Sequence, residues 1–242
     1  MAWRVGLAAL LVAWSLAADA RHGSGLLDPR HATPGIRLEL VALPPAAPAG
    51  TARYRVRLEG VPRGVAFGIW TKSFNSSDFN EVLPGFRAEE DGSLVSLDAS
   101  GARRLLGDFV LEPGPYFKGA AWTVAFASDD HKLSAFARII PYPIGARDGN
   151  CAVSLELASV HGDRFVTTGT GFAPGEMVDV EMRHSGRVTH KRQRASADGR
   201  LPAELLSLGA ATADRSARYA VKAAACEPVI EYEWGEAALK RR

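Results

Sequence analysis

Cysteine is scarce in this 242-residue chain, which holds only two, and neither sign of charge is in large excess, with 29 basic against 27 acidic side chains. So few cysteines exclude a scaffold built on many disulfides. A net charge of +2 without an internal basic block offers little attraction to a phosphate backbone, so we expect no nucleic acid partner. The 47% hydrophobic and 23% charged content is ordinary for a globular protein and excludes a disordered or collagen-like chain.

Long apolar runs are also lacking, except at the N-terminus. After Arg4, uncharged and mostly apolar residues extend from Val5 to Ala18, a stretch shorter than the roughly 20 residues that span a bilayer. One positive charge, an apolar stretch and the small residues around Ala20 are typical of a secretory signal peptide. We therefore predict a signal peptide at 1–20, a mature chain with no transmembrane segment, and a periplasmic or secreted location.

The two cysteines, Cys151 and Cys226, would then lie in an oxidising compartment. An even pair in an exported chain is most simply a disulfide bond. The alternative, two free or metal-binding thiols, has no CxxC pairing to support it. We predict a Cys151–Cys226 disulfide.

A stretch at 141–150 that is rich in proline and glycine separates two regions that both consist of short strand-like segments. It contains two prolines and two glycines and directly precedes Cys151, and such stretches are typical of domain boundaries. We predict an N-terminal domain at 21–145 and a C-terminal domain at 146–242 that contains both cysteines.

Two-residue periodicity dominates both regions. Tyr54, Val56 and Leu58 alternate with charged residues, as expected for a half-buried strand. The only helix candidate is short, at 99–106, with Asp98 or Ser100 as its N-cap. Further strands are predicted at 65–71, 122–127, 133–140, 152–157, 164–168, 177–182, 187–192 and 219–226. Short strands with almost no helical periodicity predict an all-β chain of two tandem antiparallel β-sandwich domains.

A turn motif at 169–176 has the sequence Gly-Thr-Gly-Phe-Ala-Pro-Gly-Glu and is followed by an alternating strand and later by Ala197-Asp198-Gly199-Arg200. It resembles the G-x-G-F-x-P-G-E turn of bacterial exported immunoglobulin-like modules. The resemblance covers about the second half of the chain, and the first half resembles no family that we can name. It implies an immunoglobulin-like fold and an extracytoplasmic setting, and it carries no functional residue because such modules share no common activity.

Catalytic, cofactor and metal motifs are missing from the sequence. It contains no G-x-S-x-G elbow, Walker loop or HExxH pattern, and Pro174 interrupts any dinucleotide fingerprint that would begin at Gly169. Met182, His184 and His190 are the most suggestive metal candidates, but Met182 continues the apolar face of a strand and His190 lies in a basic, solvated run. We predict no metal site, no cofactor and no assignable catalytic residue.

An enzymatic alternative stays open because carboxylates from separate loops can converge. Glu89, Asp91 and Asp129 lie beside turn residues, and paired acid–base chemistry needs carboxyl groups that face one another. Clustering of these three in one cleft would favour a carbohydrate-acting or other hydrolase.

Aromatic residues next to polar loops are the strongest binding signal in the sequence. Aromatic rings with a lysine beside them offer large contact area with a polar group, and loops carry most binding sites on β-sandwiches. The alternative is that these rings belong to the core or cover the end of a sandwich. The predicted binding residues are Trp70, Lys72, Phe74, Tyr116, Phe117 and Lys118.

Together these features favour a non-enzymatic binding or structural protein of the cell envelope, with contacts made by loops of the first domain. The partner would be an envelope protein or a glycan, which the sequence does not identify. The Ala, Arg and Gly bias and the turn motif point to a bacterial source.

Overall fold

The computed structural model describes residues 22–23, 27–46, 51–98, 100–114, 116–209 and 214–240. The predicted signal peptide at 1–20 lies outside these residues. Across the part of the chain that the structure describes, no helix is both long and apolar enough to cross a membrane.

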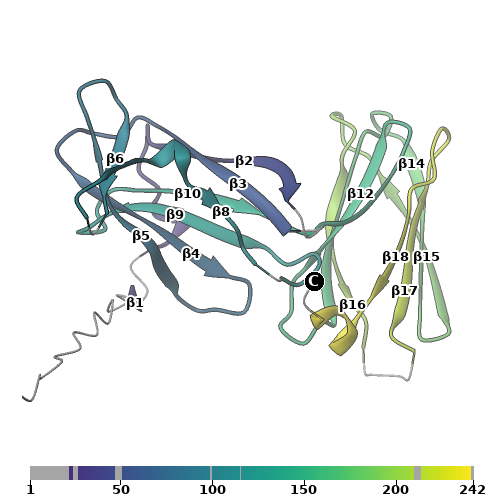
Figure 1. Cartoon of the computed structure of the whole chain (residues 1–242). Coiled ribbons are helices and arrows are strands. Elements are labelled where there is room, and N and C mark those ends of the chain that lie inside the picture. Colours follow the sequence, from purple (N-terminus) through teal and green to yellow (C-terminus); the bar gives the residue numbers. More distant parts are fainter. Residues whose placement is uncertain are drawn as a thin grey trace, which may run out of the picture.

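The predicted all-β architecture of two antiparallel β-sandwiches is confirmed (Figure 1). Four antiparallel sheets divide between two parts of the chain, and the helical segments of the described residues are short 3-10 turns. These turns are η1 (Pro29–His31), η2 (Leu106–Asp108) and η3 (Gly235–Leu239).

The first sandwich packs a small sheet against a large one. The small sheet has the order β2-β3-β8, and the large sheet has the order β10-β9-β4-β5-β6-β7 with β1 paired to β5. Phe67 stacks on Phe126 inside the sandwich, with ring centroids 4.6 Å apart. The strands are β1 (His22–Gly23), β2 (Arg37–Ala46), β3 (Thr51–Glu59), β4 (Ala66–Ser73), β5 (Phe79–Ala88), β6 (Leu94–Leu97), β7 (Arg103–Leu105), β8 (Val110–Leu111), β9 (Trp122–Ser128) and β10 (Ser134–Ile139).

The outer face of the large sheet carries a second apolar cluster. Because side chains alternate along a strand, Ile69 points into the sandwich while Trp70 points to the opposite face. There Trp70 and Phe79 are buried together with Leu27 from the N-terminal segment. This segment is held by the amide of Thr33, which donates to the carbonyl of Ser134 at 2.7 Å.

The second sandwich packs the β12 sheet, with the order β11-β12-β13-β16, against the β14 sheet, with the order β15-β14-β17-β18. Its core contains Phe165, whose ring lies edge-on to Tyr232 at 5.1 Å, and the fully buried Trp234. The strands are β11 (Ile144–Asp148), β12 (Cys151–Leu157), β13 (Arg164–Thr170), β14 (Met177–His184), β15 (Arg187–Arg194), β16 (Leu201–Ser207), β17 (Ser216–Lys222) and β18 (Val229–Glu233).

The two sides of the second sandwich are closed differently. Between β15 and β16, the Gln193 amide donates to the Glu204 carboxylate at 2.9 Å, and Lys191 forms an ion pair with the same carboxylate. Between β11 and β18 the two edge strands approach without pairing. In both places the main-chain edges of these strands are unpaired among the described residues, and the side-chain contacts between β15 and β16 distinguish the first side.

The helix predicted at 99–106 is wrong. Arg103–Leu105 forms β7, which pairs with β6 at the edge of the large sheet. The Asp98 carboxylate accepts hydrogen bonds from the amides of Ser100 and Ala102, so this predicted cap closes a turn between strands. Gly101 within the turn has a φ of 80°, outside the helical region, and the adjacent strand is exposed along its length.

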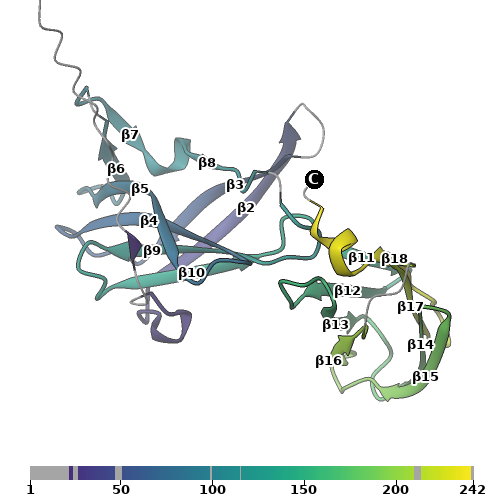
Figure 2. The ribbon, with the colours of Figure 1, turned by 90° about the horizontal axis from the view of Figure 1, so that it is seen from below.

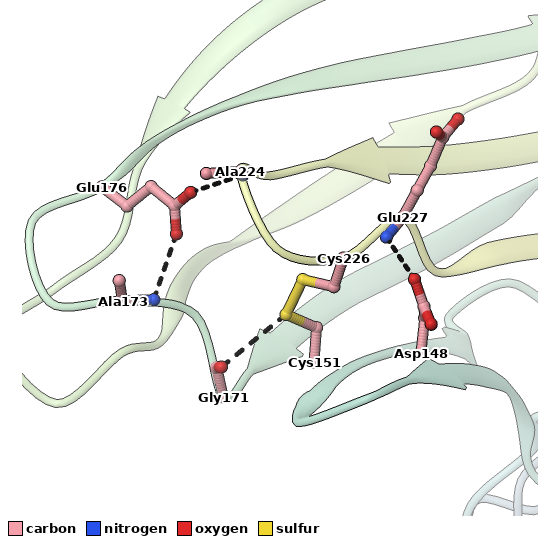
Figure 3. The surroundings of a disulfide bond; sticks show 8 residues. All are labelled: Asp148, Cys151, Gly171, Ala173, Glu176, Ala224, Cys226 and Glu227. Atoms are coloured by element: carbon pink, nitrogen blue, oxygen red, sulfur yellow. Dashed lines mark hydrogen bonds between the residues drawn. A yellow bond between two sulfur atoms is a disulfide. The ribbon is translucent and has the colours of Figure 1, made fainter.

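The disulfide between Cys151 and Cys226 is present, as predicted (Figure 3). It ties β12 to the loop after β17, across the two sheets of the second sandwich. Beside it, the amide of Glu227 donates to the Asp148 carboxylate at 2.6 Å.

The turn motif at 169–176 lies at the same end of this sandwich. A Cβ on Gly171, whose φ is 81°, would lie 1.9 Å from the carbonyl oxygen of Asn150, so only glycine fits. The Glu176 carboxylate accepts the amides of Ala173, within its own turn, and of Ala224, in the cysteine loop, at 3.1 and 2.7 Å (Figure 3). Glu176, the final residue of the motif, therefore joins two loops that are distant in sequence.

Candidate functional site

The two sandwiches meet at a hydrogen-bonded junction. The amide of Leu157, at the end of β12, donates to the carbonyl of Gly119 in the loop before β9, at 2.9 Å. Gly119 in turn donates to the carbonyl of Tyr142, in the link between β10 and β11, at 2.7 Å. Figure 1 shows η3, the yellow coil, next to this junction.

Three of the predicted binding residues form one aromatic cluster beside the junction. The rings of Phe74 and Phe117 meet edge-on at 6.5 Å, and Tyr116 lies 6.0 Å from Phe117. The Tyr116 hydroxyl accepts the amide of Phe74 and donates to the carbonyl of Ala121. Burial raises the pKa of this tyrosine, which is only 6% exposed. Tyr116 therefore links two loops and offers almost no contact area of its own.

Two other predicted binding residues lie elsewhere, on the outer face of the large sheet. Trp70 is 4% exposed and meets His131 edge-on at 5.0 Å. The Lys72 ammonium lies 5.7 Å from the ring centroid of Phe79, a cation–π distance. The sixth residue, Lys118, is exposed at the junction. The structure thus divides the six predicted residues between two places.

A groove of about 300 Å³ opens at the junction, where β11 and β18 approach each other. Its residues come from four separate segments, namely the loop before β9, the start of β11, the whole of β18 and η3. Figure 2 shows η3 beside β11 and β18. We call this the junction groove, and it is lined by Lys118, Pro143, Ile144, Gly145, Val229, Ile230, Glu231, Tyr232, Glu233, Ala237, Ala238 and Lys240.

One wall of the junction groove is an unpaired strand edge. The carbonyl of Pro228 accepts a hydrogen bond from the amide of Val221 on β17, and the amide of Trp234 donates to the carbonyl of Arg215, the residue before β17. Main-chain groups of an antiparallel strand alternate between its two neighbours, so Val229, Glu231 and Glu233 direct theirs away from β17. Within the described residues β18 pairs only with β17, so these donors and acceptors are available to a ligand.

Charged residues of both signs surround an apolar floor. Ile144, Val229 and Ala238 contribute apolar surface, whereas Lys118, Lys240, Glu231 and Glu233 are exposed. None of these four charged side chains forms an ion pair with another described residue. The groove therefore offers main-chain hydrogen bonds, apolar contact and exposed charges of both signs within one site.

The carboxylates of the enzymatic alternative are not gathered in one cleft. Glu89 and Asp91 line an open hollow of about 590 Å³ with Arg63, and Asp129 is not part of that hollow. Glu89 forms an ion pair with Arg103. Hydrogen bonds from Ser93 hold the pKa of Asp91 below its usual range, so both candidate carboxylates in the hollow, Glu89 and Asp91, already have partners.

Strand alternation separates His190 from the other two metal candidates, since Met182 and His184 lie on the same face of β14 and the His184 ring meets Trp234 edge-on at 6.3 Å. Met182 packs toward the core on β14, whereas His190 pairs with Glu181 on β15 and faces outward with it, 4.0 Å from its carboxylate. Among the described residues, no group of three or more His, Cys, Asp and Glu side chains could hold a metal ion.

The residues of the junction groove beyond Lys118 were missed from the sequence. The signal that could have found them is the pattern Ile230-Glu231-Tyr232-Glu233, an alternating strand near the C-terminus. In the structure Ile230 and Tyr232 are buried and the two glutamates are exposed. Such a pattern predicts a strand but does not show which strand or loop lies beside it.

The fold and groove define an all-β protein of two antiparallel sandwiches with a concave site at their junction. No protein-family model matches the chain, and no curated protein is significantly similar to it.

Proposed function

We propose that this chain is an exported, non-enzymatic binding protein of the bacterial cell envelope, and that it contacts its partner through the junction groove. Lys118, on a loop of the first sandwich, supplies the first-domain contact expected from the sequence. The junction then positions this loop against the edge of the second sandwich. The partner belongs to the envelope because the chain is exported with its signal peptide at 1–20 removed, leaving a periplasmic or secreted protein.

Three features support export. The N-terminal 20 residues have the composition of a signal peptide. The Cys151–Cys226 disulfide is typical of proteins that fold in oxidising compartments. The turn at 169–176 contains a glycine that no other residue could replace, a buried Phe172 and a Glu176 that joins two loops. These features are consistent with the resemblance to exported immunoglobulin-like modules.

The observation that carries the binding role is the convergence of four chain segments on one groove. Ligand sites occur preferentially where domains meet, with an apolar lining and a few placed polar groups. The junction groove lies where the two sandwiches meet, and it combines a few apolar residues with an unpaired strand edge and four exposed charges. At 300 Å³ it is large enough for one or two side chains of a partner.

The carboxylates favour a binder over a hydrolase. A general acid needs a carboxyl group whose pKa is raised by burial or by a like charge. Each described aspartate or glutamate with a clear shift has a lowered pKa, mainly through hydrogen bonds from serine or arginine side chains. These carboxyl groups are therefore ionised at neutral pH. They accept hydrogen bonds in turns and ion pairs, and they are not poised to donate a proton as a general acid.

Site-specific photo-crosslinking in cells tests the proposal. A photoreactive phenylalanine is placed at Ala237, a half-buried residue of η3 that lines the junction groove, or at Leu205, an exposed leucine on β16 away from it. Partner adducts should form from position 237 and not from position 205. Absence of adducts at position 237, or equal adducts at both positions, would contradict the proposal.

A further inference from the structure

Resting on the proposed function, we infer that the junction groove binds the C-terminal end of an extended polypeptide. Three features specify this class of ligand: an unpaired strand edge for the peptide main chain, a small apolar floor for a side chain, and two lysines for the terminal carboxylate. A glycan would leave the main-chain edge of β18 largely unused.

The strand edge provides main-chain recognition. Val229, Glu231 and Glu233 present their amides and carbonyls away from β17. An extended peptide that adds to such an edge gains several backbone hydrogen bonds, and its alternate side chains point to opposite faces. η3 follows the C-terminal end of β18 and lines the same groove, so a peptide whose C-terminal end lies there runs parallel to β18.

The apolar floor receives the last side chain of the peptide. Ile144 is 8% exposed and lies beside Ala237 and Ala238 of η3. A groove of about 300 Å³ accommodates a valine-sized or leucine-sized group more readily than a large aromatic ring with its neighbours. We therefore assign a small aliphatic residue to the C-terminal position.

The two lysines provide the carboxylate contact. Lys118 and Lys240 reach the groove from different parts of the chain and form no ion pair with described residues. A terminal carboxylate placed between them gains charge-assisted hydrogen bonds, which are stronger than neutral ones.

A glutamate sets the preference at the preceding position. On neighbouring strands, side chains that face the same way lie close together, and opposite charges favour pairing. Glu231 and Glu233 both lie on the outer face of β18; Glu231 is opposite Arg218 of β17, whereas Glu233 is opposite Ser216 and forms no ion pair with a described residue. The residue before the C-terminal one is therefore basic, giving an ending with lysine followed by a small aliphatic residue.

Fluorescence anisotropy with the mature protein tests this inference. The probe is fluorescein-Ser-Thr-Val-Lys-Val with a free C-terminal carboxylate. Its carboxamide should bind about tenfold more weakly, the value of one hydrogen bond to a charged group. A peptide N-methylated at its central valine should also lose affinity, because it cannot pair fully with the β18 edge.

Protein variants locate the binding site. The double variant Lys118→Ala/Lys240→Ala should bind acid and amide peptides equally weakly, whereas Lys222→Ala, an exposed lysine on β17, should behave as wild type. Equal binding of the acid and amide by the wild-type protein, or no binding of the probe, would overturn the inference. If adducts still form at position 237 in cells while the probe fails to bind, the proposed function stands and only the ligand class falls.

Discussion

The amide of Leu157 in the second sandwich donates a hydrogen bond to the carbonyl of Gly119 in the first, at 2.9 Å. Gly119 has a φ of 74°, and a Cβ at this position would lie 2.9 Å from Ile144 Cδ1 and 3.2 Å from the carbonyl oxygen of Leu155. The first sandwich thus approaches β11 and β12 at a point that only glycine fits without strain. This contact fixes one end of the junction groove.

Replacing this glycine should damage the junction. We expect Gly119→Ala to lower the free energy of unfolding by about 3 kcal/mol, because backbone strain and overpacking add. Gly92→Ala is the matched control, since Gly92 has a φ of 82° and open space around it, and it should cost about 1 kcal/mol. Urea unfolding of both variants measures the difference, and equal losses would show that the junction is not tightly packed at Gly119.

Tyr116 should act as a structural link. In Tyr116→Phe the amide of Phe74 and the carbonyl of Ala121 lose their partner, which costs about 1–3 kcal/mol for buried groups. The affinity for the Ser-Thr-Val-Lys-Val probe should stay at the wild-type value, because the hydroxyl does not line the groove. A weaker affinity at unchanged stability would instead make Tyr116 a direct binding residue.

The disulfide should stabilise the second sandwich mainly by restricting the unfolded chain. Cys151 and Cys226 are 75 residues apart, and closure of a loop of this size contributes about 4 kcal/mol in the chain-entropy model. Cys151→Ala/Cys226→Ala should unfold at lower urea concentration and become insensitive to reducing agent. An unchanged midpoint in the double variant would show that the bridge adds no stability.

Acid should destabilise the turn that joins β9 to β10. The Ser128 hydroxyl donates to the Asp130 carboxylate, and this bond with others lowers the pKa of Asp130 from 3.8 to about 2. The unfolded chain therefore takes up this proton at higher pH than the folded chain, so the contribution is complete above pH 3.8 and is lost as the pH falls toward 2. Asp130→Asn should have a flatter stability profile across this range in urea titrations, and an identical profile would remove Asp130 as a contributor.

Much of the fold follows from the sequence because alternation is a local property. Val178 and Val180 are buried on β14 while Asp179 between them is exposed, as the pattern predicts. β5 was missed because Pro84 and Gly85 interrupt its apolar pattern, and its pairing with β4 shifts register. The helix predicted at 99–106 failed because an Asx turn at Asp98 and an exposed edge strand look like a capped helical turn in sequence.

The candidate site was predictable only in part. Lys118 lies in a loop bounded by proline and glycine, which is a local signal for binding. Glu231, Glu233 and Lys240 join it through the packing of strands and turns that are more than 100 residues away in sequence. Their convergence depends on how the two sandwiches meet, which no local pattern reports.

Hydrogen exchange of the mature protein, with and without saturating Ser-Thr-Val-Lys-Val peptide, tests the central claim most directly. If the junction groove is the binding site, exchange of the Glu231 and Glu233 amides slows, because they pair with the added strand. Unchanged exchange at 229–233, with protection on the outer face of the large sheet around Trp70 and Lys72, would contradict the account and place binding there.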